Sequence, residues 1–354
     1  MSGDIVTGFK VGRHRIGPGE RPFVIAEMSG NHNGRLDRAL AIVDEVAMTG
    51  AQAVKIQTYR PDTITIDADG PPFRISDDHE LWAGRNLYQL YEEAHTPWEW
   101  HEPIFQRARQ HGLVAFSSPF DPTAIELLES LDCELYKVAS AELVDLPLVA
   151  AMAATGKPLV ISTGMATLAE IDAAVRAART AGARDMVVLA CTSSYPASPE
   201  DANLRSIPVL AEAFGLPVGL SDHTQGIGVS VAAVALGACV IEKHVTLDRE
   251  HGGVDSEFSL NPTELASLCR ESAAAAAAMG PARFGPRESE AEVLRLRRSL
   301  YVVADVRAGD EVTAENVRSI RPSGGLPSAD IEHVLGRRFT RDAPRGTPLG
   351  WDLV

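Results

Sequence analysis

The chain has 354 residues, of which 45% are hydrophobic and 23% are charged, values typical of globular proteins that exclude a disordered or fibrous chain. This length exceeds that of one small binding module and allows either a large barrel or two domains. The 33 Lys and Arg residues are outnumbered by 48 Asp and Glu residues, which leaves a formal net charge of -15 and makes nucleic acid an unsuitable partner. An anionic substrate would therefore need a few cationic side chains gathered in a local cleft.

The cysteines and the apolar runs favour a cytoplasmic protein with no membrane contact. Cys133, Cys191, Cys239 and Cys269 are far apart and show no C-x-x-C spacing, which favours reduced thiols. The first residues lack the pattern of a secretion signal. The longest apolar stretch, residues 229–241, is shorter than the ~20 residues that a membrane-spanning helix needs.

Short apolar runs alternate with helical patterns between residues 23 and 280. Their nearly continuous hydrophobicity is typical of parallel strands that are buried on both faces. Eight such units predict an α/β fold, a (β/α)8 TIM barrel. The expected strands cover residues 23–27, 53–57, 113–117, 135–139, 158–162, 186–190, 217–221 and 239–243. Helices are expected at residues 36–49, 123–130, 168–181, 229–236 and 265–279.

Two regions depart from this repeat. Residues 67–100 exceed an ordinary connection and are rich in Phe, Trp and Tyr, so we expect a long functional loop there. The repeat ends at Gly280-Pro281, and short strands and turns replace it near the C-terminus. We therefore predict a barrel domain at residues 1–280, a linker at 281–295 and a β-rich domain at 296–354. Because so small a domain rarely has a strong core, we expect it to dock on a barrel, its own or a partner's.

Polar residues follow every expected strand, at the barrel end where TIM-barrel enzymes place their active sites. Lys55 and Lys137 are costly inside a barrel unless they meet an anion or pair with a carboxylate such as Glu27, Glu142 or Glu242. With the hydroxyls nearby they could bind a phosphate and a carboxylate, or one lysine could form a Schiff base as in an aldolase. The polar residues expected at this rim are Glu27, Lys55, Gln57, Ser117, Ser118, Lys137, Ser140, Ser162, Thr163, Thr192, Ser193, Asp222, His223, Lys243 and His244.

His223 and His244 follow the adjacent seventh and eighth strands, so their imidazoles can converge on one divalent cation. Two histidines completed by water and substrate oxygens suit Mn²⁺, Co²⁺, Fe²⁺ or Mg²⁺ better than a closed structural zinc site. The pattern also allows each to be a hydrogen-bonding core residue. Asn33-Gly34, after the first strand, predicts a left-handed turn.

Motifs at these positions resemble those of the sialic acid synthase family of phosphoenolpyruvate-dependent synthases. The resemblance extends over nearly the whole chain, and the tail is similar to the family's antifreeze-like (SAF) domain. The barrel motifs are IAEMSGNHNG at 25–34, VKIQT at 54–58, SSPF at 117–120, YKVASAE at 136–142, ISTGM at 161–165, CTSSYP at 191–196, GLSDHT at 219–224 and IEKH at 241–244. The tail motifs are SLYV at 299–302, AGD at 308–310, IRP at 320–322 and LGR at 335–337.

This resemblance implies condensation of phosphoenolpyruvate with an open-chain amino-sugar aldehyde, giving a nine-carbon 2-keto acid and phosphate. It assigns a divalent metal, Mn²⁺ with Mg²⁺ or Co²⁺ as alternatives, to His223 and His244. Proton transfers and contacts to sugar hydroxyls would involve Glu27, Glu142 and Asp255. Phosphoenolpyruvate would be held by Lys55, Gln57, Ser118, Lys137, Ser140, Ser162, Ser193 and Tyr195. Ser118 and Ser193 depart from the Thr and Asn of sialic acid synthases.

The tail arginine Arg321 resembles the one that, in this family, reaches into a neighbouring subunit and holds the sugar's N-acetyl group. This implies a homodimer in which each tail caps the other barrel. The aromatic segment at 73–101 and DSEFSL at 255–260 are similar to the pseudaminic acid branch, whose sugar is 2,4-diacetamido-2,4,6-trideoxy-altrose. The legionaminic and N-acetylneuraminic acid branches are alternatives, and a non-catalytic carbohydrate-binding protein is a more distant one.

Overall fold

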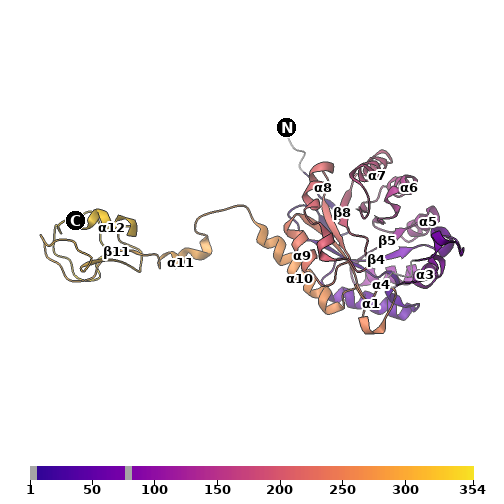
Figure 1. Ribbon diagram of the computed structural model, residues 1–354, viewed down its shortest axis with the longest axis horizontal. Coiled ribbons are helices and arrows are strands. Elements are labelled where there is room, and N and C mark those ends of the chain that lie inside the picture. The colour runs from indigo at the N-terminus through magenta and orange to yellow at the C-terminus, as the bar shows by residue number, and fades with distance from the viewer. Residues whose placement is uncertain (1–5, 76–81) are drawn as a thin grey trace. The chain divides into compact units, whose positions relative to one another are not determined.

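The computed structural model describes residues 6–75 and 82–354, and the chain divides into two compact units at residues 1–280 and 281–354 (Figure 1). Each unit has its own core of buried side chains, which in the first is mainly Val, Ile, Leu and Ala. The aliphatic character of this core agrees with the low aromatic content of 6%. No helix of the described ranges is long and apolar enough to cross a bilayer.

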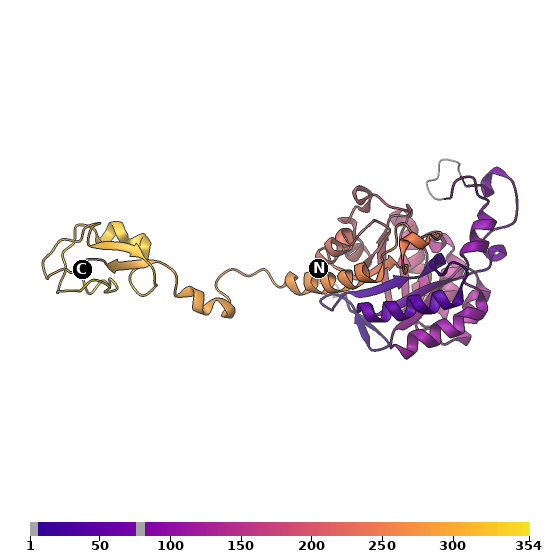
Figure 2. The same ribbon diagram turned by 90° about the horizontal axis from the view of Figure 1, so that it is seen from below.

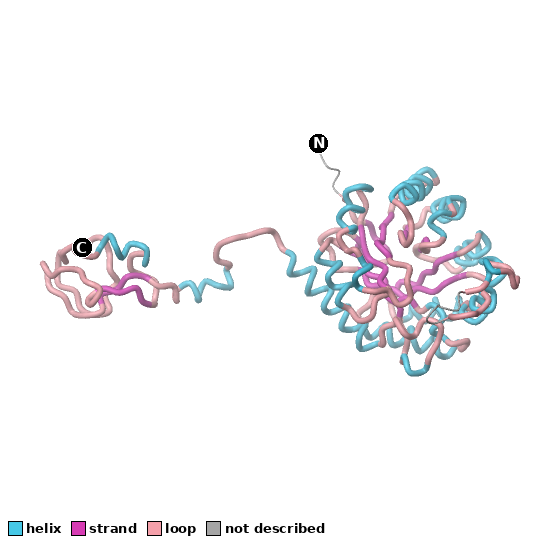
Figure 3. Tube along the Cα trace, viewed as in Figure 1, coloured by secondary structure: helices cyan, strands magenta, loops and turns pink. Residues whose placement is uncertain are grey.

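Eight parallel strands of the described chain close into a barrel, which confirms the predicted TIM barrel. The last strand pairs with both the first and the seventh, so no edge remains open. Figure 3 shows these strands in magenta, with the helices in cyan around them. The barrel strands are β3 (Phe23–Glu27), β4 (Ala53–Thr58), β5 (Val114–Pro119), β6 (Tyr136–Val138), β7 (Leu159–Ser162), β8 (Met186–Cys191), β9 (Val218–Asp222) and β10 (Ala238–His244).

The helices that follow the strands have clear start signals in the sequence. Thr167 and Glu170 form a capping box at the start of α7, and Asn261 with Glu264 forms another at α10. Figure 2 shows α10, in orange, beside the barrel. The helices are α1 (Leu36–Thr49), α4 (Trp98–Gln110), α5 (Pro122–Ser130), α6 (Leu146–Ala154), α7 (Leu168–Thr180), α8 (Ser206–Phe214), α9 (Gly228–Ala235) and α10 (Pro262–Met279).

The long loop predicted for residues 67–100 is wrong in its second half, where the chain forms α3 (Leu87–Ala94) and begins α4 at Trp98. Asn86 caps α3 by accepting a hydrogen bond from the Tyr88 amide. Two of the aromatic residues that suggested a loop, Tyr88 and Tyr91, are three residues apart, which places them on neighbouring positions of α3. Short helices α2 (Pro61–Ile64) and η2 (Pro71–Phe73) precede it, and residues 76–81 of the expected loop lie outside the described residues.

Strands β9 and β10 carry an irregular register. Strand β10 holds one extra residue at Cys239, which is a β-bulge. A Cβ on Gly219 would lie 2.3 Å from the Val240 carbonyl oxygen, so only glycine allows this approach. The paired residues are Ala238 with Val218, Val240 with Gly219, Glu242 with Ser221 and Lys243 with Asp222.

The two ends of the chain form smaller elements. An antiparallel hairpin of β1 (Phe9–Val11) and β2 (His14–Ile16) precedes the barrel and buries its apolar side chains in the same core. In the second unit, β11 (Ser299–Val302) pairs antiparallel with β12 (Val317–Ile320), after the short helix α11 (Ala291–Leu294). Isolated bridges, such as Val306 with Ala343, and the short helix α12 (Ile331–Val334) complete it.

Candidate active site

Polar side chains gather inside the barrel because neighbouring strands are in register. Residues that pair across a ladder point to the same face, and the face alternates along each strand. Lys55 pairs with Glu27, which pairs in turn with His244, so the three share the inner face. The inner polar side chains at the carboxyl ends of the strands are Glu27, Lys55, Gln57, Ser118, Lys137, Ser162, Cys191, Ser221, Glu242 and His244.

Lys55 lies in a buried ion-pair cluster. Its Nζ is 2.6 Å from Glu27 Oε2 and 3.7 Å from Glu242 Oε1, and it donates to Ser118 Oγ at 3.3 Å. Burial alone would lower the pKa of Lys55, but the Glu242 and Glu27 carboxylates outweigh it and raise that pKa. Lys55 is therefore a cation at neutral pH, and the carboxylate pairing considered from the sequence holds for this lysine.

Lys137 lies in a different environment. Its Nζ donates to the Val138 carbonyl oxygen at 3.0 Å, and it belongs to none of the ion pairs found among the described residues. Burial lowers the pKa of Lys137, and the negative charge of Glu242 opposes this shift. Glu242 has a lowered pKa because Lys137 and Lys55 outweigh the effect of its own burial. The centre of the barrel end, called the electropositive site below after its two lysines, thus has spare donor capacity at Lys137.

Serine hydroxyls surround this site from β6 to β8. Ser162 Oγ is buried without a hydrogen-bond partner in the described structure. Ser140 and Ser193 converge on Gly164, where a Cβ would lie 2.3 Å from Ser140 Cβ and 2.8 Å from Ser193 Oγ. The two serines approach this glycine closely because it has no Cβ, and their hydroxyls are donors suited to anion oxygens.

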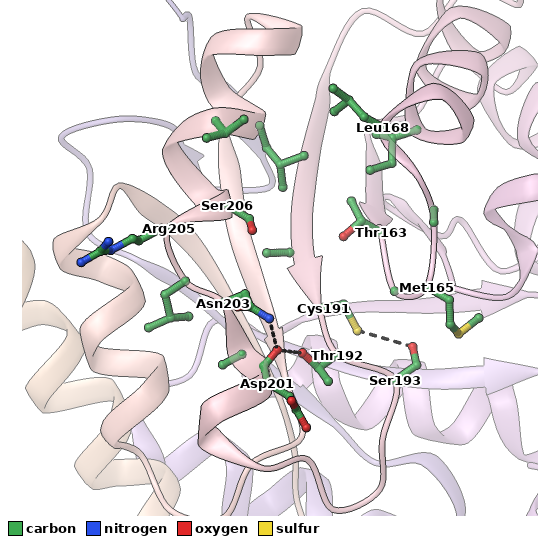
Figure 4. Close-up of a pocket in the computed structure, with 18 of the residues that line it drawn as sticks. Thr163, Met165, Leu168, Cys191, Thr192, Ser193, Asp201, Asn203, Arg205 and Ser206 are labelled. Atoms are coloured by element: carbon green, nitrogen blue, oxygen red, sulfur yellow. Dashed lines mark hydrogen bonds between the residues drawn. The ribbon is translucent and has the colours of Figure 1, made fainter.

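A groove of about 1180 Å³ opens beside these serines, between the segments that follow β7 and β8. Figure 4 shows Cys191 and Ser193 facing each other, with Sγ and Oγ 3.9 Å apart. Thr192 Oγ1 and Asn203 Nδ2 both donate to the Asp201 carbonyl oxygen, which fixes the far wall (Figure 4). The groove therefore exposes Cys191 and Ser193 at the side of the barrel.

His223 and His244 lie next to each other, with ring centroids 5.3 Å apart. His223 Nδ1 is 2.9 Å from the Thr192 carbonyl oxygen, which can only accept, so Nδ1 carries the hydrogen and the neutral ring offers Nε2 as a ligand. Burial and the neighbouring His223 lower the pKa of His244 well below its usual range, which keeps it neutral. His244 Nδ1 is buried without a hydrogen-bond partner in the described structure.

These two imidazoles fit a divalent cation only if oxygen ligands complete the coordination. Nowhere in residues 6–75 and 82–354 do three or more His, Cys, Asp or Glu side chains gather as a possible cation site. Asp255 Oδ2 lies 3.9 Å from His244 Nδ1 and is the nearby carboxylate. Two imidazoles with open positions match sites that also bind water or substrate.

A second cavity, of about 400 Å³, lies beside the histidines. Its polar residues are Ser29, Gln57, Asp255 and His244. Burial raises the pKa of Asp255, although Ser29, the Gly30 amide and His223 oppose the shift. The remaining residues of the cavity wall are mainly apolar or aromatic and comprise Tyr59, Ile75, Trp82, Leu87, Leu90, Tyr91, Ala94, Tyr195 and Val254.

The predicted site residues thus divide between two neighbouring places. The electropositive site is surrounded by Lys55, Ser118, Lys137, Ser140, Ser162 and Ser193. The aromatic cavity is lined by Gln57 and Tyr195, together with Asp255 and His244. Gln57 Nε2 donates to Glu27 Oε1 and Ser29 Oγ, both at 3.0 Å. The ring centroids of Tyr195 and His223 are 4.5 Å apart, so the aromatic cavity and the electropositive site are neighbours.

Two other predicted residues lie outside this division. Glu142 begins the short helix η3 (Glu142–Val144) after β6; burial raises its pKa, and its Oε2 has no hydrogen-bond partner in the described structure. Arg321 belongs to the second unit, where it follows β12 and lines a hollow with Arg297 and Arg298. Its contact with a neighbouring subunit stays a prediction.

Three residues expected at the rim, Ser117, Asp222 and Lys243, lie on the outer face instead. Ser117 donates to the Ile56 carbonyl oxygen and bonds Thr58 on the outer side of the barrel. Lys243 is also outside, paired with Asp222 at 2.9 Å. Every polar residue near a strand end was expected at the rim. Successive side chains of a strand point to opposite faces, so only every second residue points into the barrel.

Sequence reasoning did not assign several residues of the cavity. Ser29 and Tyr59 each lie just beyond a barrel strand, and their position there is a signal that was present in the sequence. Tyr91 and Leu90 come from α3, which was expected to be a loop. Phe258, three residues after Asp255, packs its ring 4.9 Å from that of His244.

Comparisons with known proteins agree with this architecture. The NeuB family matches residues 42–283, and the SAF domain matches residues 297–354. Pseudaminic acid synthase of Helicobacter pylori is 39% identical over 94% of this chain and 98% of its own, and N,N'-diacetyllegionaminic acid synthase of Campylobacter jejuni is 34% identical over 91% and 97%. The crystal structure of N-acetylneuraminic acid synthetase from Leptospira borgpetersenii, in complex with citrate, has a TM-score of 0.73 and 31% identity, covering 82% of this chain and 95% of that one. The chain therefore belongs to the NeuB family of synthases and ends in a SAF domain.

Proposed function

We propose that this chain condenses phosphoenolpyruvate with a 2,4-diacetamido-2,4,6-trideoxy sugar aldehyde, as a pseudaminic acid synthase. The observation that carries the proposal is the adjacency of an electropositive serine-lined site and an aromatic cavity at one barrel end. Two substrates of opposite character, one anionic and one partly apolar, can thus meet at His223 and His244. Relatives that match nearly the whole chain carry the names of such synthases.

Phosphoenolpyruvate fits the electropositive site. Lys137 has free donor capacity, and Lys55 and Ser118 extend the site toward β4 and β5. The phosphate would accept hydrogen bonds from the hydroxyls of Ser140, Ser162 and Ser193, two of which lie close to Gly164. Burial of these cations strengthens their interaction with an anion because water screens it less.

A divalent cation, Mn²⁺ or alternatively Mg²⁺ or Co²⁺, would be held by His223 and His244 with oxygen ligands. When bound, it would supply Lewis-acid polarisation of the aldehyde. His223 is oriented through Nδ1 toward the Thr192 carbonyl, and His244 is kept neutral by its burial. His223 is thus oriented as a ligand and His244 is neutral, whereas Cys191 raises the pKa of His223, so a cation would compete with a proton there.

The proposed reaction needs one proton donor, one proton acceptor and one water molecule. C3 of the enol attacks the aldehyde carbon, and the aldehyde oxygen takes a proton from a buried carboxylic acid. Asp255 is the group whose raised pKa and place beside His244 suit this transfer. Water then adds at the cationic C2 and gives one proton to the carboxylate of Glu27 or Glu142. The bond from C2 to the phosphate oxygen breaks, and the proton of the remaining C2 hydroxyl leaves with the phosphate, which gives the 2-keto acid.

The aromatic cavity supports the choice of sugar. Methyl groups at C6 and on two acetamido groups present apolar surface, and α3 offers Leu87, Leu90, Tyr91 and Ala94 to them. A fully hydroxylated sugar would leave hydroxyls unpaired against this wall, which costs binding free energy.

The C-terminal domain, through Arg321, is proposed to complete the sugar site of a second subunit. Arg321 would hold an acetamido carbonyl in the barrel of a neighbouring subunit, which requires a homodimer with exchanged tails. Residues 281–295 would serve as the linker between the barrel and the domain at 296–354. Replacing Arg321 by Ala in one subunit and Lys137 by Met in the other would leave active mixed dimers only if the tails are exchanged in this way, because the intact barrel then receives the intact tail.

The direct test measures phosphate release from phosphoenolpyruvate with Mn²⁺, with and without EDTA. Three aldehydes are compared: 2,4-diacetamido-2,4,6-trideoxy-altrose, its legionaminic-type epimer and N-acetylmannosamine. We expect release with the altrose sugar that EDTA abolishes. Release chiefly with N-acetylmannosamine would contradict the sugar assignment, and trapping of a lysine by borohydride without any need for metal would indicate an aldolase.

A further inference from the structure

The outer face of the barrel carries a buried ion pair directly beside the two histidines. Lys243 Nζ lies 2.9 Å from Asp222 Oδ2, and the exposed fractions of the two side chains are 0% and 1%. Asp222 immediately precedes His223, and Lys243 immediately precedes His244. The chemistry inside the barrel does not use this pair, because alternation turns both side chains away from the site.

The pair fixes the backbone on both sides of His223. Asp222 Oδ1 accepts from the Thr224 amide and from Thr224 Oγ1, both at 2.8 Å. Lys243 Nζ donates to the Thr224 carbonyl oxygen. The residue before His223 and the residue after it are therefore tied together, and both are tied to the strand that carries His244.

A third contact anchors the pair to the helix layer. Ser230 Oγ, on α9, donates to Asp222 Oδ2 at 2.5 Å. On the inner side, the His223 ring is held by the Thr192 carbonyl, the looser thiol of Cys191, whose Sγ lies 4.0 Å from Nδ1, and the ring of Tyr195. The outer face adds the restraints on the backbone that carries this ring.

We propose that Asp222, Lys243 and Ser230 form a positioning clamp that sets the spacing of His223 and His244 for a divalent cation. The inference rests on the metal site of the proposed function. Burying two charges costs several kcal/mol each, and apolar pairs of similar volume often stabilise a fold better. Stability alone therefore does not account for an ion pair here, whereas outer partners that orient metal ligands are typically needed for full affinity.

The test uses the double substitution Asp222→Asn/Lys243→Met, which removes both charges and the bond to the Thr224 carbonyl. Because no lone charge stays buried, this variant is expected to fold. Ser230→Ala is a second, milder variant that removes only the anchor on α9. Lys157→Met is the matched control, since it breaks the ion pair with Glu129, at the opposite end of the barrel.

Mn²⁺ binding to the metal-free full-length proteins is followed by electron paramagnetic resonance, and unfolding is followed by circular dichroism. We expect the Mn²⁺ Kd of the double variant to rise ~10–100-fold, that of Ser230→Ala to rise less, and that of Lys157→Met to match wild type. The spectrum of residual bound Mn²⁺ should also change in the double variant.

The outcomes separate the clamp from the metal site itself. If wild type binds Mn²⁺ and the double variant binds it equally well while its unfolding temperature falls, the pair is purely structural and the clamp is wrong. If wild type and control bind no Mn²⁺, both the metal site and the clamp are wrong. Tighter binding by either clamp variant would also overturn the inference.

Discussion

Lys137 and Lys243 are both buried lysines of barrel strands, but one faces the inside and the other the outside. Lys243 has an aspartate and a backbone carbonyl as partners. Lys137 has one backbone carbonyl as its partner, and burial lowers the pKa of both lysines. The difference separates a lysine whose interactions are complete within the fold from one that can still bind an anion.

The same contrast extends to the neighbouring atoms. Ser162 Oγ, Glu242 Oε2 and His244 Nδ1, all inside, are buried without hydrogen-bond partners in the described structure. Outside, both carboxylate oxygens of Asp222 accept hydrogen bonds. Unpaired buried groups cost free energy, so their concentration at one end of the barrel is typical of a site that a ligand completes.

The largest expected effect is on stability at the outer lysine. Lys243→Met alone leaves Asp222 charged and buried, which should lower the free energy of unfolding by about 3–5 kcal/mol. Urea denaturation followed by circular dichroism measures it. The matched inner change, Lys137→Met, should leave the free energy of unfolding unchanged or higher, and an equal loss in both variants would contradict the comparison.

The inner lysine should show its effect on activity. Lys137→Met removes a cation from the electropositive site and should lower kcat/KM by about 10²–10³-fold, as loss of one donor to a developing charge does. Phosphate release at varied phosphoenolpyruvate concentration measures it. Lys157→Met serves as the control and should retain wild-type kinetics; retained kinetics in Lys137→Met would show that this lysine does not bind the substrate.

A smaller effect is expected at the cavity wall. Leu90→Ala removes apolar contact on α3 and should reduce the preference for the diacetamido sugar over N-acetylmannosamine by about 10-fold, because a few methylenes give only modest discrimination. The ratio of kcat/KM values for the two sugars measures it. Met48→Ala, at an exposed position on α1, is the control. An unchanged ratio would place the sugar's methyl groups elsewhere.

The smallest effect concerns pH. Burial alone would lower the pKa of His223, but the hydrogen bond and charge of Cys191 outweigh it and raise that pKa. Cys191→Ala should therefore lower the pKa of His223. Since only the neutral ring binds a cation, the pH midpoint of Mn²⁺ binding should shift downward. Cys133→Ala, at a buried thiol elsewhere in the core, should leave the midpoint in place, and an upward shift in Cys191→Ala would contradict this account.

The sequence allowed the barrel to be predicted because its strands are continuous apolar runs, each within two residues of the observed bounds. The left-handed turn predicted at Asn33-Gly34 is also confirmed, with φ of 51° and 68°. Helix α3 was missed because the aromatic content of the whole stretch 67–100 was taken as a loop signal, although most residues of α3 are good helix formers.

For the site, composition and position near strand ends identified the candidate residues but not their faces. The placement of Ser117 and Lys243 on the outside depends on the phase of each strand, which one polar residue does not reveal. The partners of Lys55 and the lack of a carboxylate partner for Lys137 in the described structure depend on which strands meet across the barrel. That information is in the closed topology and not in any single motif.

The extra residue at Cys239 determines which side chains of β10 and β9 point into the barrel together. In a straight ladder continued from Ala238 and Val218, Lys243 would pair with His223 instead of Asp222. Residues that pair share a face, so either an ammonium would enter the site or an imidazole would leave it. The bulge shifts the pairing of β10 with β9 by one residue, and the lack of a side chain at Gly219 permits this shift. A substitution there would rearrange the chemistry of the barrel end while leaving every functional residue in the sequence.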